Sequence, residues 1–172
     1  TMQRATRGAG FLEPLLARLR AARANALIPA DRRSGTILDI GCGAFPAFLA
    51  STRFAHKLAV DRQYESSLPQ GLPADINAGF FDANADRALP FDDASADVVT
   101  MLAVFEHILP QRLPFLLSDI FRVLRPGGSF VMTTPSSAAA PVLRLLSRTG
   151  AISPEEFEEH QDHYSRERVK AV

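Results

Sequence analysis

The feature that most constrains the fold is a series of five short apolar runs that alternate with turns and helical patterns. The runs lie at residues 36–40, 58–61, 79–82, 96–103 and 129–134. Their apolar side chains fall on both faces of an extended chain, as burial within a parallel sheet requires. Strands that alternate with helices indicate βαβ units. The sequence therefore predicts an α/β fold with a mainly parallel sheet.

Helical spacing marks further segments. Residues 9–24 carry a predicted amphipathic helix, which we expect to form a lid or wall over a ligand site. The apolar residues on which this helix would pack are Phe11, Leu12, Leu15, Leu16 and Leu19. Shorter patterns predict helices at 44–54 and 113–124. We expect one domain over residues 1–172, with a helical cap at 1–35, a core at 36–135 and a helical segment at 136–172.

Composition excludes several classes of protein. Lys plus Arg and Asp plus Glu both number 19, and this balance disfavours a nucleic-acid substrate. No apolar run is long enough to span a bilayer, and no secretory signal pattern is present. We therefore expect a cytoplasmic protein without a membrane partner. His160, Asp162 and His163 do not follow a zinc-ligand spacing, so no metal is expected.

A glycine-containing turn at residues 39–43 follows the first predicted strand. Glycines there allow the backbone to approach a ligand at the carboxyl edge of the sheet. Dinucleotide sites use a third glycine in this turn, but Pro46 stands at that position and would crowd a pyrophosphate. Adenosylmethionine has no phosphate, and Asp39 is placed to help hold its α-amino group.

Acidic residues end the next two runs. Asp61 ends the second run, where a carboxylate can accept hydrogen bonds from both ribose hydroxyls. Asp82 ends the third run, where it can accept from the adenine amino group while Phe81 or Ala83 touches the ring. Asp61 serves NAD and adenosylmethionine equally, so these residues predict an adenosine-containing ligand without choosing between the two.

Six motifs in order carry a resemblance to a known family. They are ILDIGCG at 37–43, VD at 60–61, FDA at 81–83, LPF at 89–91, ADVV at 96–99 and LRPGG at 124–128. Together they resemble the class I adenosylmethionine-dependent methyltransferases that act on small molecules. The resemblance covers about residues 37–135. It implies a three-layer Rossmann-like α/β/α sandwich with strand order 3-2-1-4-5. It also implies methyl transfer to an O, N or C atom, with adenosylhomocysteine as product.

The resemblance also assigns site residues. Those implied for the cofactor are Asp39, Gly41, Cys42, Gly43, Asp61, Arg62, Phe81, Asp82, Ala83 and Ala103. Those implied for the substrate side are Phe105, Glu106, His163 and Tyr164. His107 is a candidate general base, since imidazole titrates near neutral pH, or else a residue that lines the site or caps a helix. Cys42 is interpreted as a small packing residue rather than a nucleophile.

Two departures from the family pattern keep alternatives open. Phe45 stands where the family usually has a third glycine, which would narrow or reshape the methionine pocket. Only five of the usual seven strands are predicted, so the chain is either a shortened variant or a piece of a longer protein. An open sheet edge would favour a homodimer. The alternatives are an adenosylmethionine-binding module or partner subunit without catalysis, and an NAD-dependent oxidoreductase.

Overall fold

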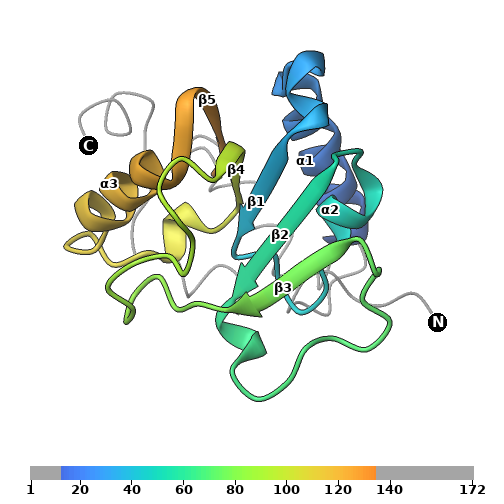
Figure 1. The fold of residues 1–172 in the computed structure, drawn as a ribbon. Coiled ribbons are helices and arrows are strands. Elements are labelled where there is room, and N and C mark those ends of the chain that lie inside the picture. The colour runs from blue at the N-terminus through green and yellow to red at the C-terminus, as the bar shows by residue number, and fades with distance from the viewer. Residues whose placement is uncertain (1–12, 135–172) are drawn as a thin grey trace, which may run out of the picture.

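The computed structural model of this chain describes residues 13–134, and within them a single sheet of five strands forms the centre of the molecule (Figure 1). The strands are β1 (Thr36–Ile40), β2 (His56–Asp61), β3 (Ile76–Phe80), β4 (Ala96–Leu102) and β5 (Leu124–Thr133). They are ordered β3-β2-β1-β4-β5, and every pairing is parallel. The predicted fold class and strand order are confirmed.

Helices cover both faces of this sheet (Figure 1). The α-helices are α1 (Glu13–Leu27), α2 (Ala47–Ser51) and α3 (Leu113–Val123), and the 3₁₀ helices are η1 (Ala30–Ser34), η2 (Arg62–Tyr64) and η3 (Phe105–His107). One apolar cluster joins α3 to the sheet, and a second joins α1 and α2 to the opposite face. None of the helices in the described part of the chain is long and apolar enough to cross a membrane.

The central strands are apolar on both faces because both faces are covered. In β1, Leu38 and Ile40 belong to the cluster under α3, whereas Ile37 belongs to the cluster under α1 and α2. Val99 and Val98 of β4 divide in the same way. This alternation follows from the two-residue period of a strand.

The apolar pattern that predicted a helix at residues 113–124 corresponds to the buried face of α3. Leu113, Leu116, Ile120 and Val123 are buried at three- and four-residue spacing, which places them on one face of the helix. The helix ends at Val123, and β5 begins at the next residue. The regular pairing of β5 with β4 from Ser129 onward confirms the predicted fifth strand, and a register irregularity precedes it.

The N-terminal helix differs from the prediction. Its described part runs to Leu27 and buries Ala24 together with Ile28, just beyond the helix, whereas Leu15 and Leu19 are 53% and 54% exposed. The predicted packing of Leu15 and Leu19 is wrong: both are exposed, and the helix instead meets the sheet through Ala24, with Ala21 packed against the same apolar cluster. The placement of α1 as a lid stays a prediction, and residues before 13 lie outside the described part.

Two further boundaries were predicted too broadly or too late. Helix α2 spans only Ala47–Ser51, because the turn before it continues through Phe45 to Pro46, the residue that caps the helix. Strand β3 ends at Phe80, so the prediction that Asp82 ends this strand is wrong. Asp82 instead lies in the turn that follows, where its side chain accepts a hydrogen bond from the backbone of Asn84.

A polar contact fixes the amino-terminal edge of the sheet, away from the glycine turn. The Asp97 carboxylate accepts hydrogen bonds from the Thr36 backbone N–H at 2.8 Å and from the Arg125 guanidinium at 2.5 Å. Gly35 leaves the space for this carboxylate, because a Cβ at Gly35 would lie 2.1 Å from the Asp97 Oδ2 atom. The contact therefore joins β1, β4 and β5 at the edge opposite the ligand-binding edge.

Gly35→Ala is expected to lower the free energy of unfolding by about 1–3 kcal/mol, the usual cost of forcing an extra carbon into a filled site. Gly79→Ala is the matched control, because a Cβ at Gly79 meets nothing within 4 Å. That variant should stay within about 0.5 kcal/mol of the parent. Urea unfolding of both variants measures the difference, and equal stabilities would contradict the proposed role of Asp97.

Candidate functional site at the carboxyl edge of the sheet

The glycine turn after β1 bends back over the end of β2. Gly41 and Gly43 have φ angles of +73° and +79°, in the left-handed region that favours glycine. The Gly41 N–H donates to the Val60 carbonyl at 2.8 Å. A Cβ at Gly41 would lie 2.4 Å from a methyl carbon of Val104, so glycine also permits close approach by the segment after β4.

The Asp61 carboxylate joins this turn to the end of β2. One oxygen accepts the Gly43 N–H at 2.8 Å, and the other accepts the Gln63 N–H at 2.9 Å. Asp61 is 6% exposed, and each of its oxygens still has capacity for a second hydrogen bond. The predicted ribose residue is therefore held in place by its own neighbours. Arg62, which follows it, is exposed.

Tyr64 and Cys42 complete the floor of the turn. The Tyr64 hydroxyl donates to the Gly43 carbonyl at 2.9 Å and lies 3.1 Å from the Cys42 Sγ atom. Burial raises the pKa of the Cys42 thiol far above its ordinary value, so the thiol stays protonated. A protonated, half-buried thiol fits the interpretation of Cys42 as a packing residue and not that of a nucleophile.

Asp39 is buried close to Asp61. It is 3% exposed, and one of its carboxylate oxygens accepts a hydrogen bond from the Thr100 hydroxyl at 2.6 Å. Burial raises the pKa of Asp39 to about 7, the Thr100 hydrogen bond opposes this rise, and the negative charge of Asp61 adds to it. The carboxyl group therefore changes charge near neutral pH, beneath the glycine turn.

The predicted adenine residues lie in the turn after β3. The Asp82 Oδ1 atom accepts the Asn84 N–H at 2.9 Å, and its other oxygen takes no hydrogen bond from the described residues. The Asp82 N–H donates to Asp86 at 2.7 Å. Phe81 is buried in the core, whereas Ala83 is half-buried. The turn thus presents one free carboxylate oxygen and a small apolar side chain.

The segment after β4 carries the predicted substrate side. Ala103 has a φ angle of +58°, a strained conformation for a residue with a Cβ, and such strain is concentrated at functional sites. Phe105 and Glu106 are buried at 1% and 2% exposure, whereas His107 is half-buried. Their roles toward an acceptor stay predictions. His163 and Tyr164 lie outside the described residues.

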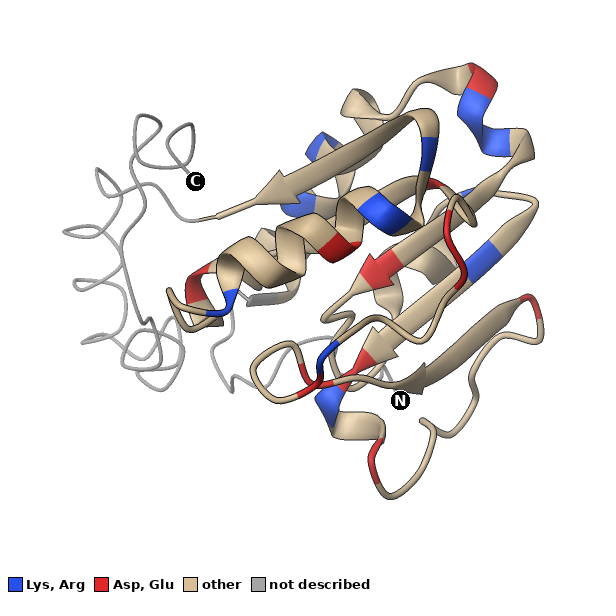
Figure 2. Ribbon diagram, turned by 60° about the vertical axis from the view of Figure 1, so that its left-hand side comes forward, with Lys and Arg blue, Asp and Glu red and all other residues tan. Residues whose placement is uncertain are grey.

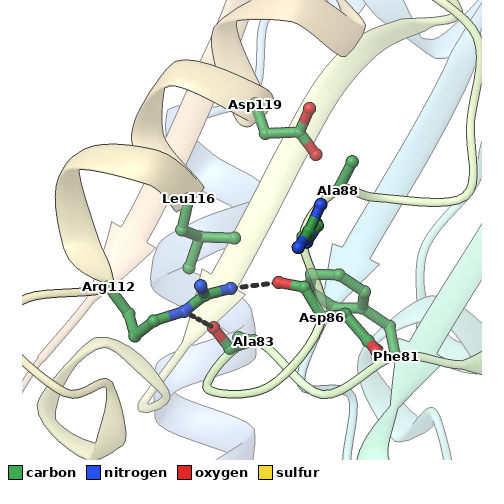
Figure 3. A pocket seen from close by; sticks show the side chains of 8 residues that line it. Phe81, Ala83, Asp86, Ala88, Arg112, Leu116 and Asp119 are labelled. Atoms are coloured by element: carbon green, nitrogen blue, oxygen red, sulfur yellow. Dashed lines mark hydrogen bonds between the residues drawn. The ribbon is translucent and has the colours of Figure 1, made fainter.

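Acidic residues gather at this edge, and red segments mark the arrowheads of neighbouring central strands in Figure 2. A small hollow lies beside the edge, between the turn after β3 and helix α3 (Figure 3). It is lined by Phe81, Ala83, Asp86, Arg87, Ala88, Arg112, Leu116 and Asp119. Because Phe81 and Ala83 are its only predicted cofactor residues, the hollow borders the adenine side of the site.

The geometry bears on which cofactor the residues can hold. A pyrophosphate is usually held by free N–H groups at a helix N-terminus. Here the helix after the glycine turn has only five residues and is capped by Pro46, which has no N–H. When ionised, Asp39 beneath the glycine turn is also an unfavourable neighbour for phosphate. The residues at this edge therefore suit an adenosine ligand with a positively charged amino-acid portion better than a dinucleotide.

Sequence reasoning missed three residues that shape the site. Tyr64, Thr100 and Asn84 each hold a predicted site residue or its backbone through a hydrogen bond. Only the backbone contact of Asn84 had a local signal, since an aspartate side chain commonly accepts a hydrogen bond from the backbone N–H two residues on. Thr100 contacts a residue 61 positions away, and no local pattern indicates such a contact.

Comparison with known proteins places the chain among methyltransferases. The family model described as "Methyltransferase domain" matches residues 38–132. The ubiquinone/menaquinone biosynthesis C-methyltransferase UbiE of Brucella anthropi is 35% identical over 128 residues, which are 68% of this chain and 47% of that protein. The chain thus spans less than half the length of this relative.

Solved structures agree on the fold. A SAM-dependent methyltransferase from Archaeoglobus fulgidus aligns with a TM-score of 0.65 and 22% identity, over 94% of this chain and 69% of that one. A phosphoethanolamine N-methyltransferase from Haemonchus contortus, in complex with phosphoethanolamine and S-adenosylhomocysteine, aligns with a TM-score of 0.52 and 21% identity, over 70% of this chain and 27% of that one.

Asp39→Asn is expected to change how stability depends on pH. The folded pKa of Asp39 is about 7 against an ordinary value of 3.8, so its contribution to stability is fully present below about pH 4 and is lost progressively as pH rises from there to about 7. Between about pH 5 and about pH 8, the parent should lose about 2–3 kcal/mol more than the variant. Urea unfolding at both pH values measures this, and parallel pH profiles would contradict the burial argument.

Proposed function

This chain belongs to the family of class I adenosylmethionine-dependent methyltransferases, and from that premise we propose that it transfers a methyl group to a small molecule. The acceptor atom is an oxygen, nitrogen or carbon, and adenosylhomocysteine is the second product. The described residues would hold the cofactor along the carboxyl edges of β1, β2 and β3. A cytoplasmic location and a homodimer stay predictions from the sequence alone.

One observation carries the proposal: the Asp61 carboxylate ties the glycine turn to the end of the neighbouring strand. This contact leaves one hydrogen-bonding position on each carboxylate oxygen. Two neighbouring hydroxyl groups, as on a ribose, are the donors that such a pair of oxygens accepts. The glycine turn lies directly beside it, and at Gly43 the backbone carries no Cβ that would keep a ligand away.

The remaining cofactor residues extend from this point in both directions. Asp82 and Ala83 would receive the adenine through the free carboxylate oxygen and the small side chain. Phe81, Arg62 and Ala103 would complete the cofactor residues that the resemblance implies. On the other side, the turn at residues 41–43 and the buried Asp39 would surround the methionine portion, whose amino group is cationic at neutral pH.

When bound, adenosylmethionine supplies a methyl group that is already activated on a sulfonium. The protein's main contribution is therefore to align the acceptor, and such positioning can contribute roughly 7–11 kcal/mol. The segment after β4 provides the walls for an acceptor next to the glycine turn, since Val104 closely approaches Gly41. His107 would remove a proton from acceptors that must lose one.

Asp61→Ala is expected to weaken adenosylhomocysteine binding by roughly 10- to 100-fold or more, because charge-assisted hydrogen bonds to the ribose are lost. Calorimetric titration of the parent and the variant measures this. Asp92→Ala is the control, since it removes an exposed carboxylate outside the site. Urea unfolding of each variant separates a binding defect from a folding defect.

Two results would contradict the proposal. One is an intact parent protein that binds neither adenosylmethionine nor adenosylhomocysteine. The other is a folded Asp61→Ala variant that binds with the affinity of the parent, because the carboxylate would then have no part in holding the ribose.

A further inference from the structure

Asn84 connects two loops that the proposed function assigns to different ligands. The adenine-side loop, residues 81–86, follows β3, and the acceptor-side loop, residues 103–112, follows β4. The Asn84 Oδ1 atom accepts the Leu109 N–H at 2.8 Å, and the Asn84 Nδ2 atom donates to the His107 carbonyl at 3.1 Å. One amide side chain thus pairs with the backbone of the other loop through both its donor and its acceptor.

The same residue is fixed within its own loop. The Asn84 N–H donates to the Asp82 carboxylate at 2.9 Å. The backbone of Asn84 therefore contacts the adenine-side loop, while its side chain contacts the acceptor-side loop. These contacts run from the predicted adenine-binding carboxylate to the backbone of the candidate base, His107. Asp82 is thus linked to the acceptor-side loop through the backbone N–H and the side chain of one residue, Asn84.

Arg112 provides a second connection between the same loops. Its Nε atom donates to the Ala83 carbonyl at 3.4 Å, and a terminal nitrogen donates to the Asp86 carbonyl (Figure 3). Arg112 is the last residue before α3, so it joins the adenine-side loop to the point where the acceptor-side loop enters that helix. The two loops are thus joined both in the middle and at the end of the acceptor-side loop.

The acceptor-side loop has little regular structure of its own. It contains the three-residue helix η3, and it begins with the strained residue Ala103, whose N–H donates to the Thr133 carbonyl of β5 at 2.9 Å. Phe105 and Ile108 anchor this loop in the apolar core, and the Asn84 side chain holds the backbone on either side of Ile108 through His107 and Leu109.

We propose that Asn84 is a positioning residue that couples cofactor binding at the adenine-side loop to ordering of the acceptor-side loop. The inference rests on the proposed function, because it takes Asp82 and Ala83 as the adenine contacts. Ligand contact with Asp82 restrains Asn84, and Asn84 then restrains the backbone of His107 and Leu109. By reciprocity, an acceptor that orders this loop also strengthens cofactor binding.

Amide hydrogen exchange of the full chain, with and without saturating adenosylhomocysteine, tests this coupling. In the parent, the ligand is expected to slow exchange in peptides spanning residues 103–112 by roughly fivefold or more, at the low end of common coupling factors. In Asn84→Asp the donor to His107 is lost and a carboxylate faces a carbonyl. The ligand-induced slowing should then fall below about twofold.

Matched variants keep the test specific. Asn77→Asp makes the same substitution at an exposed position of β3 and should behave as the parent does. Asn84→Ser, which has one hydroxyl in place of the amide pair, should also lose the ligand-induced slowing, and it serves if Asn84→Asp does not fold. A purely structural role for Asn84 would speed exchange equally with and without ligand, and would leave the ligand-induced difference intact.

The outcomes separate the inference from the function on which it rests. If the parent and both Asn84 variants bind adenosylhomocysteine and show the same ligand-induced slowing, the coupling is overturned while the proposed function stands. If the parent does not bind adenosylhomocysteine at all, both are overturned. Loss of the slowing in the Asn84 variants, with retention in Asn77→Asp, supports the coupling.

Discussion

Two backbone N–H groups, those of Gly43 and Gln63, converge on the Asp61 carboxylate, and the arrangement of the site depends on this convergence. A turn with two left-handed residues has no regular backbone pairing of its own, so its N–H groups need acceptors from elsewhere. Asp61 supplies one, Val60 supplies another, and Tyr64 donates to the carbonyl of Gly43. The end of β2 thus shapes the turn that follows β1.

A sheet covered on both faces leaves its strand ends as the place for polar chemistry. Asp39 is the carboxyl group buried within this edge. Burial raises its pKa to about 7, and one of its two oxygens accepts a hydrogen bond from the Thr100 hydroxyl. Asp61 is the last residue of β2, and Asp82 lies in the turn after β3. At both positions the carboxylate accepts a hydrogen bond from a backbone N–H group of a turn. The same edge therefore holds one deeply buried carboxyl group and two carboxylates that accept hydrogen bonds from backbone N–H groups of turns.

The strands and helix α3 could be predicted because each depends on a local pattern, such as the buried spacing of Leu113, Leu116 and Ile120. The strand order was an implication of the family resemblance and not of any local pattern. The glycine turn and the acid Asp61 were also visible in the sequence, because each stands where a predicted strand ends. Their roles toward a cofactor stay predictions. Leu15 and Leu19 were placed wrongly, because apolar residues lie on more than one face of α1 and Ala24, not these leucines, is the one buried against the sheet. Contacts between distant loops, such as Asn84 with Leu109, leave no local trace.

The most direct test of the account is a crystal structure of this chain grown with adenosylhomocysteine. The account predicts that the ribose hydroxyls donate to both oxygens of Asp61, with the adenine at Asp82 and Ala83 and the amino-acid portion over Gly41 and Gly43. A ligand bound elsewhere, or a ribose that does not contact Asp61, would contradict the claim that this carboxylate organises both the turn and the cofactor.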